Sequence, residues 1–237
     1  IDVDHVQFYV GNAKQAAFLA ASPRTDGRWR LRSVDLDDTV ELGPDELVPG
    51  TPGWHSYLAG VVWALREAGH EVGGADLVLT SDVPLGAGLS SSAAIECAAL
   101  TALADLNGLD IAPMDRAKLA RVAENAYVGA PTGLLDQAAS TLCVADHALF
   151  LDCRTLETRQ VPLAVTAAGL EILVIDTRTR HSHVDGEYAA RRASCEEACR
   201  LLGVPALRDV TDLDDALARL PEQTGRRVRH VVTENQR

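Results

Sequence analysis

A glycine- and serine-rich loop that runs directly into an apolar helix constrains the fold of this chain most strongly. The stretch ADLVLTSDVP reads as a strand, PLGAGLSSS follows it, and AAIECAALTALADLNG is apolar on nearly every side, which predicts a buried helix. Backbone N–H groups converge where such a loop enters a helix, and the helix dipole adds about half a positive charge. The segment therefore predicts a site that can hold an anion, most often phosphate.

The residues of the loop suit this chemistry, although a structural explanation is also open. Gly86 and Gly88 let the main chain approach oxygen atoms without a Cβ in the way, and Ser90, Ser91 and Ser92 offer hydroxyls to phosphate or magnesium. The loop lacks the lysine of a Walker motif, and Ser91 stands where a dinucleotide fingerprint needs its third glycine. A glycine turn with a serine N-cap explains the same composition equally well.

Hydrophobic periodicity predicts the other elements. Val6, Phe8 and Val10 alternate as in a strand, and Asn12 then precedes an alanine-rich stretch that can start a helix. The remaining predictions are strands at FLAAS and RWRLRSVDL joined by a hairpin turn at Asp26-Gly27, a helix over residues 54–69, a helix at DRAKLARVAENAYVG, a buried strand over residues 170–177 and a helix at EYAARRASCEEACRLLG. Irregular alternation of strands and helices indicates an α+β or mixed α/β class.

Composition excludes several classes of function. Lysine and arginine number 22 against 34 aspartates and glutamates, and the net charge of −12 argues against binding to nucleic acid or to an anionic membrane. No apolar run approaches the roughly 20 residues that span a bilayer, and no leader pattern opens the chain, so we expect a soluble, cytoplasmic protein. The five cysteines form no CxxC pair, which predicts reduced core thiols.

Several segments resemble one family of kinases. PLGAGLSSSAA resembles the second signature motif of the GHMP kinases, and ENAYVGAPTGLLDQAAS resembles the galactokinase segment that carries the catalytic aspartate. IDTRTRHSHVDGEYAARRASCEEA and RHVVTENQR also resemble galactokinase segments, and another GHMP kinase such as homoserine kinase does not explain LLDQ followed by DGEY. The resemblance implies ATP- and Mg²⁺-dependent phosphorylation of galactose to galactose 1-phosphate. It also implies the two-layer α+β GHMP kinase fold with a left-handed βαβ unit.

The resemblance assigns roles to individual residues. Asp136 corresponds to the catalytic carboxylate, Ser92 and Glu124 to the magnesium ligands, and Gly133 together with Asp136 to galactose contacts. The ATP phosphate-binding set is Pro84, Leu85, Gly86, Ala87, Gly88, Leu89, Ser90, Ser91, Ser92 and Ala93. From the residues alone, Asp136 reads as a helix cap and Glu124 as a solvated charge just outside the apolar face of its helix.

Both ends of the chain depart from the family pattern. Where galactokinases carry an arginine-containing motif, this chain reads VDHVQFYVGNAKQAA, which resembles the beginning of hydroxyphenylpyruvate dioxygenases without placeable iron ligands. The third GHMP motif is also missing. We therefore expect a truncated galactokinase with a fused segment over residues 1–17, an amino-terminal ATP-binding domain over residues 18–165 and the incomplete start of a carboxyl-terminal domain over residues 166–237.

Such a truncation bears on activity and on association. Loss of the arginine lowers the rate of phosphoryl transfer by about 10³- to 10⁵-fold where such a group acts, so a defective fragment or a nucleotide- or sugar-binding module is the alternative to an active kinase. The intact family is monomeric, but an uncovered apolar face in this chain predicts self-association.

Overall fold

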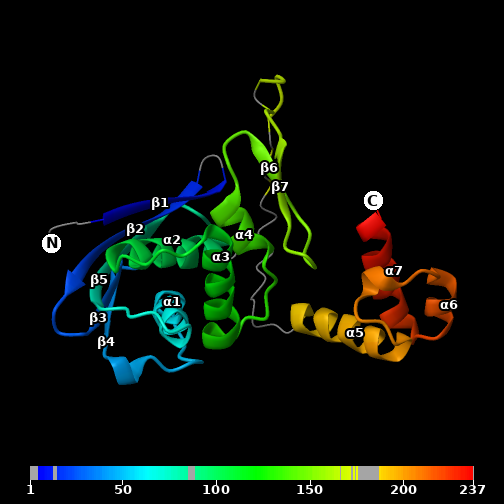
Figure 1. The fold of residues 1–237 in the computed structure, drawn as a ribbon, viewed down its shortest axis with the longest axis horizontal. Helices are drawn as coiled ribbons and strands as arrows, with labels where there is room; N and C mark the ends of the chain where they lie inside the picture. Colours follow the sequence, from blue (N-terminus) through cyan, green and yellow to red (C-terminus); the bar gives the residue numbers. More distant parts are fainter. Residues whose placement is uncertain are drawn as a thin grey trace. The chain divides into compact units, whose positions relative to one another are not determined.

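The computed structural model describes residues 5–12, 15–84, 89–165, 167–171, 173, 175 and 187–236. The chain divides into two compact units, Ile1–His181 and Ser182–Arg237. The strands of the first unit are β1 (His5–Asn12), β2 (Gln15–Arg24), β3 (Trp29–Ser33), β4 (Asp38–Leu42), β5 (Gly74–Ser81), β6 (His147–Leu151) and β7 (Thr158–Pro162) (Figure 1). Its helical elements are η1 (Pro44–Glu46), α1 (Ser56–Glu67), α2 (Ser91–Leu106), α3 (Pro113–Val122), η2 (Ala123–Val128) and α4 (Leu135–Leu142). Among the described residues, no helix combines the length and the apolar character needed to span a bilayer.

A five-stranded sheet in the order β1-β2-β5-β3-β4 forms one layer of the first unit (Figure 1). Its neighbouring strands are antiparallel except β3 and β5, which run parallel with α1 between them along the chain. The register places Leu19 opposite Leu79, and places Leu77 opposite both Ala21 and Leu31. All five side chains are buried. Alternating side chains point to opposite faces of a strand, so these residues define the core face of the sheet.

Helices α1 and α2 supply the second layer. The four apolar residues of α1 that the helical spacing predicts as buried, Leu58, Val61, Val62 and Leu65, are each 0% exposed. Helix α2 is buried along most of its length, as its apolar composition predicts, and it packs with α1 and the sheet residues in one hydrophobic cluster. Both helix predictions are confirmed, and the unit has the predicted α+β class.

Two predictions about the first thirty residues are wrong. The stretch after Asn12 forms β2 instead of a helix, and it pairs antiparallel with β1 so that Phe8 lies opposite Phe18. Asp26-Gly27 does form a turn, with Gly27 at a φ of 70°, but the strands on either side are not hydrogen-bonded to each other because β5 lies between them. Pairing with a strand about fifty residues later along the chain has overridden the local hairpin signal.

Gly74 permits β5 to enter between β2 and β3. A Cβ at this position would lie 2.6 Å from the carbonyl oxygen of Arg28 and 2.8 Å from its backbone nitrogen. We expect Gly74→Ala to lower the free energy of unfolding by about 1–3 kcal/mol, because the backbone of Gly27 and Arg28 must move. Gly73→Ala is the matched control, since its Cβ would meet only Asn107 Oδ1, at 3.5 Å. Equal losses in urea denaturation of the two variants would contradict the close approach as the cause.

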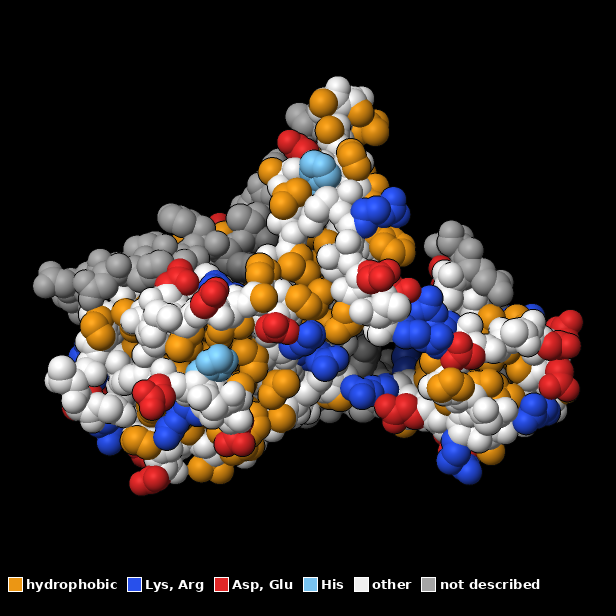
Figure 2. Space-filling model, in the orientation of Figure 1, with side chains coloured by type: hydrophobic (Ala, Val, Ile, Leu, Met, Phe, Trp, Pro, Cys, Tyr) orange, Lys and Arg blue, Asp and Glu red, His pale blue; other side chains and the backbone are white. Residues whose placement is uncertain are grey.

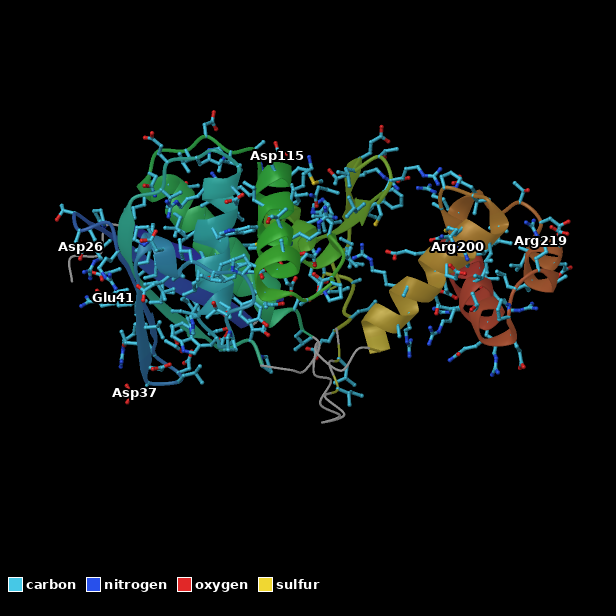
Figure 3. All side chains as sticks on the ribbon, turned by 90° about the horizontal axis from the view of Figure 1, so that it is seen from below. Asp26, Asp37, Glu41, Asp115, Arg200 and Arg219 are labelled. Atoms are coloured by element: carbon cyan, nitrogen blue, oxygen red, sulfur yellow. The ribbon has the colours of Figure 1, made fainter. Side chains whose placement is uncertain are left out.

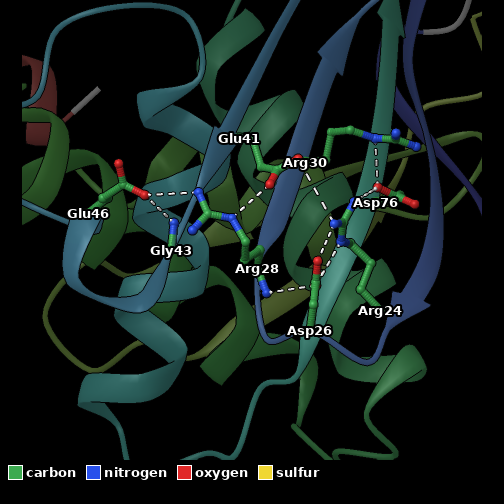
Figure 4. Close-up of polar contacts among 8 residues, drawn as sticks. All are labelled: Arg24, Asp26, Arg28, Arg30, Glu41, Gly43, Glu46 and Asp76. Carbon is green, nitrogen blue, oxygen red and sulfur yellow. Dashed lines mark hydrogen bonds and ion pairs between the residues drawn. The ribbon is translucent and has the colours of Figure 1, made fainter.

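Ion pairs line the opposite face of the sheet (Figure 4). Arg30 Nε lies 2.8 Å and Arg24 Nη1 lies 3.0 Å from Asp76 Oδ1, while Arg28 Nε lies 2.7 Å from Glu41 Oε1. Ion pairs at a protein surface typically contribute at most about 1 kcal/mol each. Their main consequence is that the outer face and the β4 edge present charge to the solvent, which opposes pairing with other strands.

The segment after β7 contradicts the predicted buried strand over residues 170–177. Leu170, Leu173 and Ile175 are 61%, 80% and 73% exposed, and no strand forms among the described residues of this segment. The other part of the predicted strand lies outside the described residues. An apolar run becomes a strand only when neighbouring strands pair with it, and in the described part of the chain β6 and β7 pair only with each other.

Hydrophobic side chains are also exposed around β6 and β7, where Figure 2 shows them on the surface. Phe150 of β6 is 52% exposed and Leu163, which follows β7, is 47% exposed. Exposed apolar side chains favour association between molecules. The self-association of this chain stays a prediction.

The second unit is helical and comprises α5 (Glu187–Leu202), η3 (Leu207–Asp209), α6 (Leu213–Ala218) and α7 (Glu222–Gln236). Helix α5 ends before Gly203, whose φ is 73°, as the sequence predicts. The small core of this unit consists of Ala198, Leu207, Val228 and Val232. Arg200 forms an ion pair with Glu197 within α5, and Arg219 forms one with Asp215 of α6. Both arginines are labelled in Figure 3.

The cysteines follow the prediction only in part. All five are free, and Cys97 is buried in the core of the first unit. Cys143 and Cys153 are exposed, so the predicted core position is wrong for these two. They lie in the connections on either side of β6, and connections run over the surface, where an apolar thiol gains no burial.

Candidate active site at the starts of helices α2 and α4

The backbone at the amino-terminal turn of α2 favours an anion. The first regular backbone bond runs from the Ala94 N–H to the Ser90 carbonyl at 3.0 Å, so the preceding amides of the turn are those that a helix leaves without internal partners. Helix α2 has no acidic residue in its first turn. These amides and the positive end of the helix dipole favour negative charge at this point.

Ser90 has a backbone conformation that is rare for a residue with a side chain. Its φ of 58° and ψ of 40° are left-handed, and its hydroxyl makes no capping bond to the helix. The structure therefore does not support the alternative in which the serine serves as a side-chain N-cap. Left-handed backbone at residues other than glycine is concentrated at functional sites, because the strain needs a compensating role.

The predicted phosphate-binding residues are only partly described. Leu85, Gly86, Ala87 and Gly88 lie outside the described residues. Of the others, Pro84 is exposed, Leu89, Ser90 and Ser91 are half-buried, and Ser92 and Ala93 are buried. The phosphate-binding role of the set stays a prediction.

Glu124 lies in the interior, because it follows Ala117 and Ala120 of α3 at helical spacing and shares their buried face. The predicted helix is divided into α3 and the π-helix η2, in which the Gly129 N–H donates to the Glu124 carbonyl, five residues back, at 3.0 Å. Glu124 is only 2% exposed, so the prediction that it is a solvated charge is wrong. π-Helical turns occur frequently at functional sites.

Four side chains form a buried polar cluster between α2, η2 and α4. Gln137 Nε2 donates to Glu124 Oε2 at 2.6 Å and to Glu96 Oε2 at 3.3 Å. Thr132 Oγ1 donates to the same Glu124 oxygen at 2.6 Å. Glu96 and Gln137 are both 0% exposed. The cluster thus holds two carboxylates in the interior with one amide between them.

The electrostatics of this cluster favour a neutral Glu96. Burial, followed by the charge of Glu124, raises the pKa of Glu96 well above its ordinary value, although the bond from Gln137 opposes this shift. Burial is also the main cause that raises the pKa of Tyr57, with Glu124 and Glu96 contributing further. Among the described residues, no lysine or arginine forms an ion pair with either glutamate. A proton on Glu96 therefore relieves the repulsion between the two carboxylates.

Glu124 and Ser92 fit a magnesium ion. In the described part of the chain, no donor contacts Glu124 Oε1, because both bonds to this carboxylate use Oε2. Ser92 lies one turn before Glu96 in α2, and residues four apart share a helix face, so its side chain is on the side that faces this cluster. Carboxylate and hydroxyl oxygens suit Mg²⁺, which also keeps waters and substrate phosphates as ligands. No group of three or more His, Cys, Asp or Glu with metal-binding geometry occurs among the described residues.

Asp136 lies beside this cluster in the sequence but not in the interior. It occupies the first turn of α4 and is exposed, whereas its neighbour Gln137 points into the core. Gly133, just before α4, is also exposed. The structure therefore joins Glu124 to α2 and α4 through buried contacts, and leaves Asp136 and Gly133 accessible to a ligand.

Sequence reasoning missed Glu96, Gln137 and Thr132. One signal was present for Glu96, which is a charged residue in the middle of a mostly apolar helix and stands four residues after Ser92. Gln137 bonds to Glu96 across 41 residues of sequence. No local pattern reveals a contact of that separation.

Comparisons with known proteins match this chain to GHMP kinases and galactokinases. The family model of the GHMP kinases N terminal domain matches residues 56–143, which include α1 to α4. The galactokinase of Streptomyces coelicolor is 55% identical over 227 residues, which are 93% of this chain and 59% of that protein. The galactokinase of Mycobacterium tuberculosis is 43% identical over 242 residues, which are 99% of this chain and 66% of that protein. The chain thus spans about three-fifths to two-thirds of the length of these relatives.

A solved structure matches the fold. The crystal structure of Lactococcus lactis galactokinase complexed with galactose aligns with a TM-score of 0.84 at 24% sequence identity, covering 99% of this chain and 68% of that one. The predicted GHMP kinase fold is thereby confirmed.

Proposed function

Because this chain belongs to the galactokinase family of the GHMP kinases, we propose that it provides the phosphate-binding helix, the metal ligands and the catalytic carboxylate of an ATP-dependent galactose kinase. The family resemblance carried by its motifs is confirmed. The observation that most supports the activity is the convergence of α2, η2 and α4, which links Glu124 to Glu96 beside the open turn of α2 and places Asp136 at the adjoining helix start.

In the proposed reaction, the C1 hydroxyl oxygen of galactose forms a bond to the γ-phosphorus of ATP. The bond from that phosphorus to the bridging β-γ oxygen breaks and ADP leaves, while the hydroxyl proton passes to the carboxylate of Asp136. The products are galactose 1-phosphate and ADP.

The chain's own residues prepare the nucleotide for this step. The amides at the start of α2 and the hydroxyls of Ser90 and Ser91 bind phosphate oxygens. Ser92 and Glu124 hold Mg²⁺, which supplies neutralisation of the phosphate charge when bound. ATP and galactose are the small-molecule partners in this proposal.

A coupled assay of ADP release tests the proposal directly. We expect turnover that requires ATP, Mg²⁺ and galactose together, because phosphoryl transfer needs the acceptor hydroxyl as well as the positioned phosphates. Reactions without galactose measure background hydrolysis. If ATP raises the melting temperature while galactose produces no additional ADP, the chain is a nucleotide-binding module and the proposed kinase activity is wrong.

A further inference from the structure

The side chain of Gln137 connects two carboxylates that no other described contact joins. Its Nε2 donates to Glu124 Oε2 and to Glu96 Oε2, so the two hydrogens of one amide are both used. With two bonds to fixed acceptors and 0% exposure, the amide has a single orientation. The bond to Glu96 thereby orients the amide of Gln137, and the amide in turn orients the carboxylate of Glu124.

The bonds to Glu124 are asymmetric. Gln137 and Thr132 both donate to Oε2, each at 2.6 Å, and among the described residues Oε1 receives no donor. Two short bonds to one oxygen fix the plane of a carboxylate and leave its other oxygen for a ligand. Because hydrogen-bonded supports orient the ligands of metal sites, this arrangement is the one expected behind a metal-binding carboxylate.

Stability alone does not explain the cluster. A buried carboxylate beside a second buried carboxyl group, with no basic partner among the described residues, is costly, and replacing buried charged groups by apolar ones of similar volume is often neutral or stabilising. The backbone of Gln137 is held separately, since its carbonyl accepts from Cys97 Sγ at 3.8 Å. Helix α4 is thus anchored to α2 without the side-chain amide.

We propose that Gln137 is a positioning residue, whose amide fixes Glu124 through Oε2 so that Oε1 is directed to the Mg²⁺ that accompanies the nucleotide. The inference rests on the proposed function for the identity of that ligand. It adds that the start of α4 serves the site twice, since Asp136 faces the acceptor and Gln137 supports the metal ligand.

The test is calorimetric titration of the chain with AMP-PNP, in excess Mg²⁺ and again in EDTA. We expect Gln137→Met to weaken binding about 10- to 100-fold in Mg²⁺, the range typical for loss of a residue that supports a metal ligand. In EDTA the affinity of parent and variant should be equal, because methionine preserves the volume and removes only the amide. A purely structural role would weaken both titrations alike.

Gln160→Met is the matched control. Gln160 has one side-chain bond, from Nε2 to the Leu142 carbonyl at 2.7 Å, and like Gln137 it has a buried Oε1 without a donor among the described residues. The Mg²⁺-dependent affinity should be unchanged in this variant. Thr132→Val, which removes the other donor to Glu124 Oε2, should weaken it in the same direction, so the inference is tested even if Gln137→Met fails to fold.

Three results would overturn the inference: equal weakening in Mg²⁺ and EDTA, an equal effect of Gln160→Met, or a parent chain that binds AMP-PNP no better with Mg²⁺ than with EDTA. The galactose-dependent release of ADP is measured separately. If it is absent while the Mg²⁺-specific effect of Gln137→Met is present, the proposed activity fails and the positioning role stands.

Discussion

Replacement of Asp136 by asparagine should lower the rate of galactose-dependent ADP release by about 10²- to 10⁴-fold, the usual contribution of a positioned general base. Asparagine keeps the shape of the side chain and cannot take the proton of the acceptor hydroxyl. Asp136 is exposed in the first turn of α4 and makes no hydrogen bond with any described residue, so the melting temperature should be nearly unchanged. Initial rates at saturating ATP, Mg²⁺ and galactose measure the effect.

The matched control for this variant is Asp115→Asn. Asp115 is likewise exposed in the first turn of a helix, α3, where its Oδ1 lies 2.8 Å from Lys118 Nζ (Figure 3). We expect full activity from this variant, since any effect of helix dipole and surface charge is common to both positions. A rate in Asp136→Asn equal to that of the control would show that Asp136 is not the base.

Truncation of Leu77 should produce the largest loss of stability. Leu77 is 0% exposed in the central strand β5, opposite Ala21 on one side and Leu31 on the other. Leu77→Ala should lower the free energy of unfolding by about 2–5 kcal/mol, because it removes buried methyl groups and leaves a cavity beneath the helices. At about 2–4 °C per kcal/mol for a chain of this size, the melting temperature should fall by roughly 4–20 °C.

Tryptophan fluorescence is the appropriate probe for this measurement. All three tryptophans, Trp29, Trp54 and Trp63, lie in the first unit, so their signal reports the unit that contains Leu77. Leu36→Ala is the control, since Leu36 is 50% exposed and its truncation should change the free energy of unfolding by no more than about 0.5 kcal/mol. Similar losses in the two variants would contradict the assignment of Leu77 to the core.

Local periodicity predicts the elements whose burial is decided by their own residues. Helices α1 and α2 follow from apolar spacing and composition, and α5 ends at the glycine that the sequence indicates. The predictions fail where distant partners decide the outcome. The residues of β2 become a strand because β1 and β5 pair with them, whereas Leu170, Leu173 and Ile175, described apolar residues after β7, stay exposed.

The candidate site shows the same division between local and distant information. The anion-binding turn of α2 and the role of Asp136 are predicted from motifs that are continuous in the sequence. The burial of Glu124 is missed because its charge predicts an exposed position, although Ala117 and Ala120 on the same helix face are buried. Its partners are Thr132, from the following loop, and Gln137, from helix α4. Their convergence on one oxygen is a property of the packed structure alone.

The place of β5 between β2 and β3 also affects how the chain folds during its synthesis. Until Ser81 has left the ribosome, β2 and β3 each have an open edge where β5 will later pair. Open edges of apolar strands can pair with other nascent chains, and closure of the sheet waits for residues about fifty positions further along. The sheet can therefore close only after α1 and β5 have emerged, and the interval before this is the period in which the protein is most exposed to misassembly.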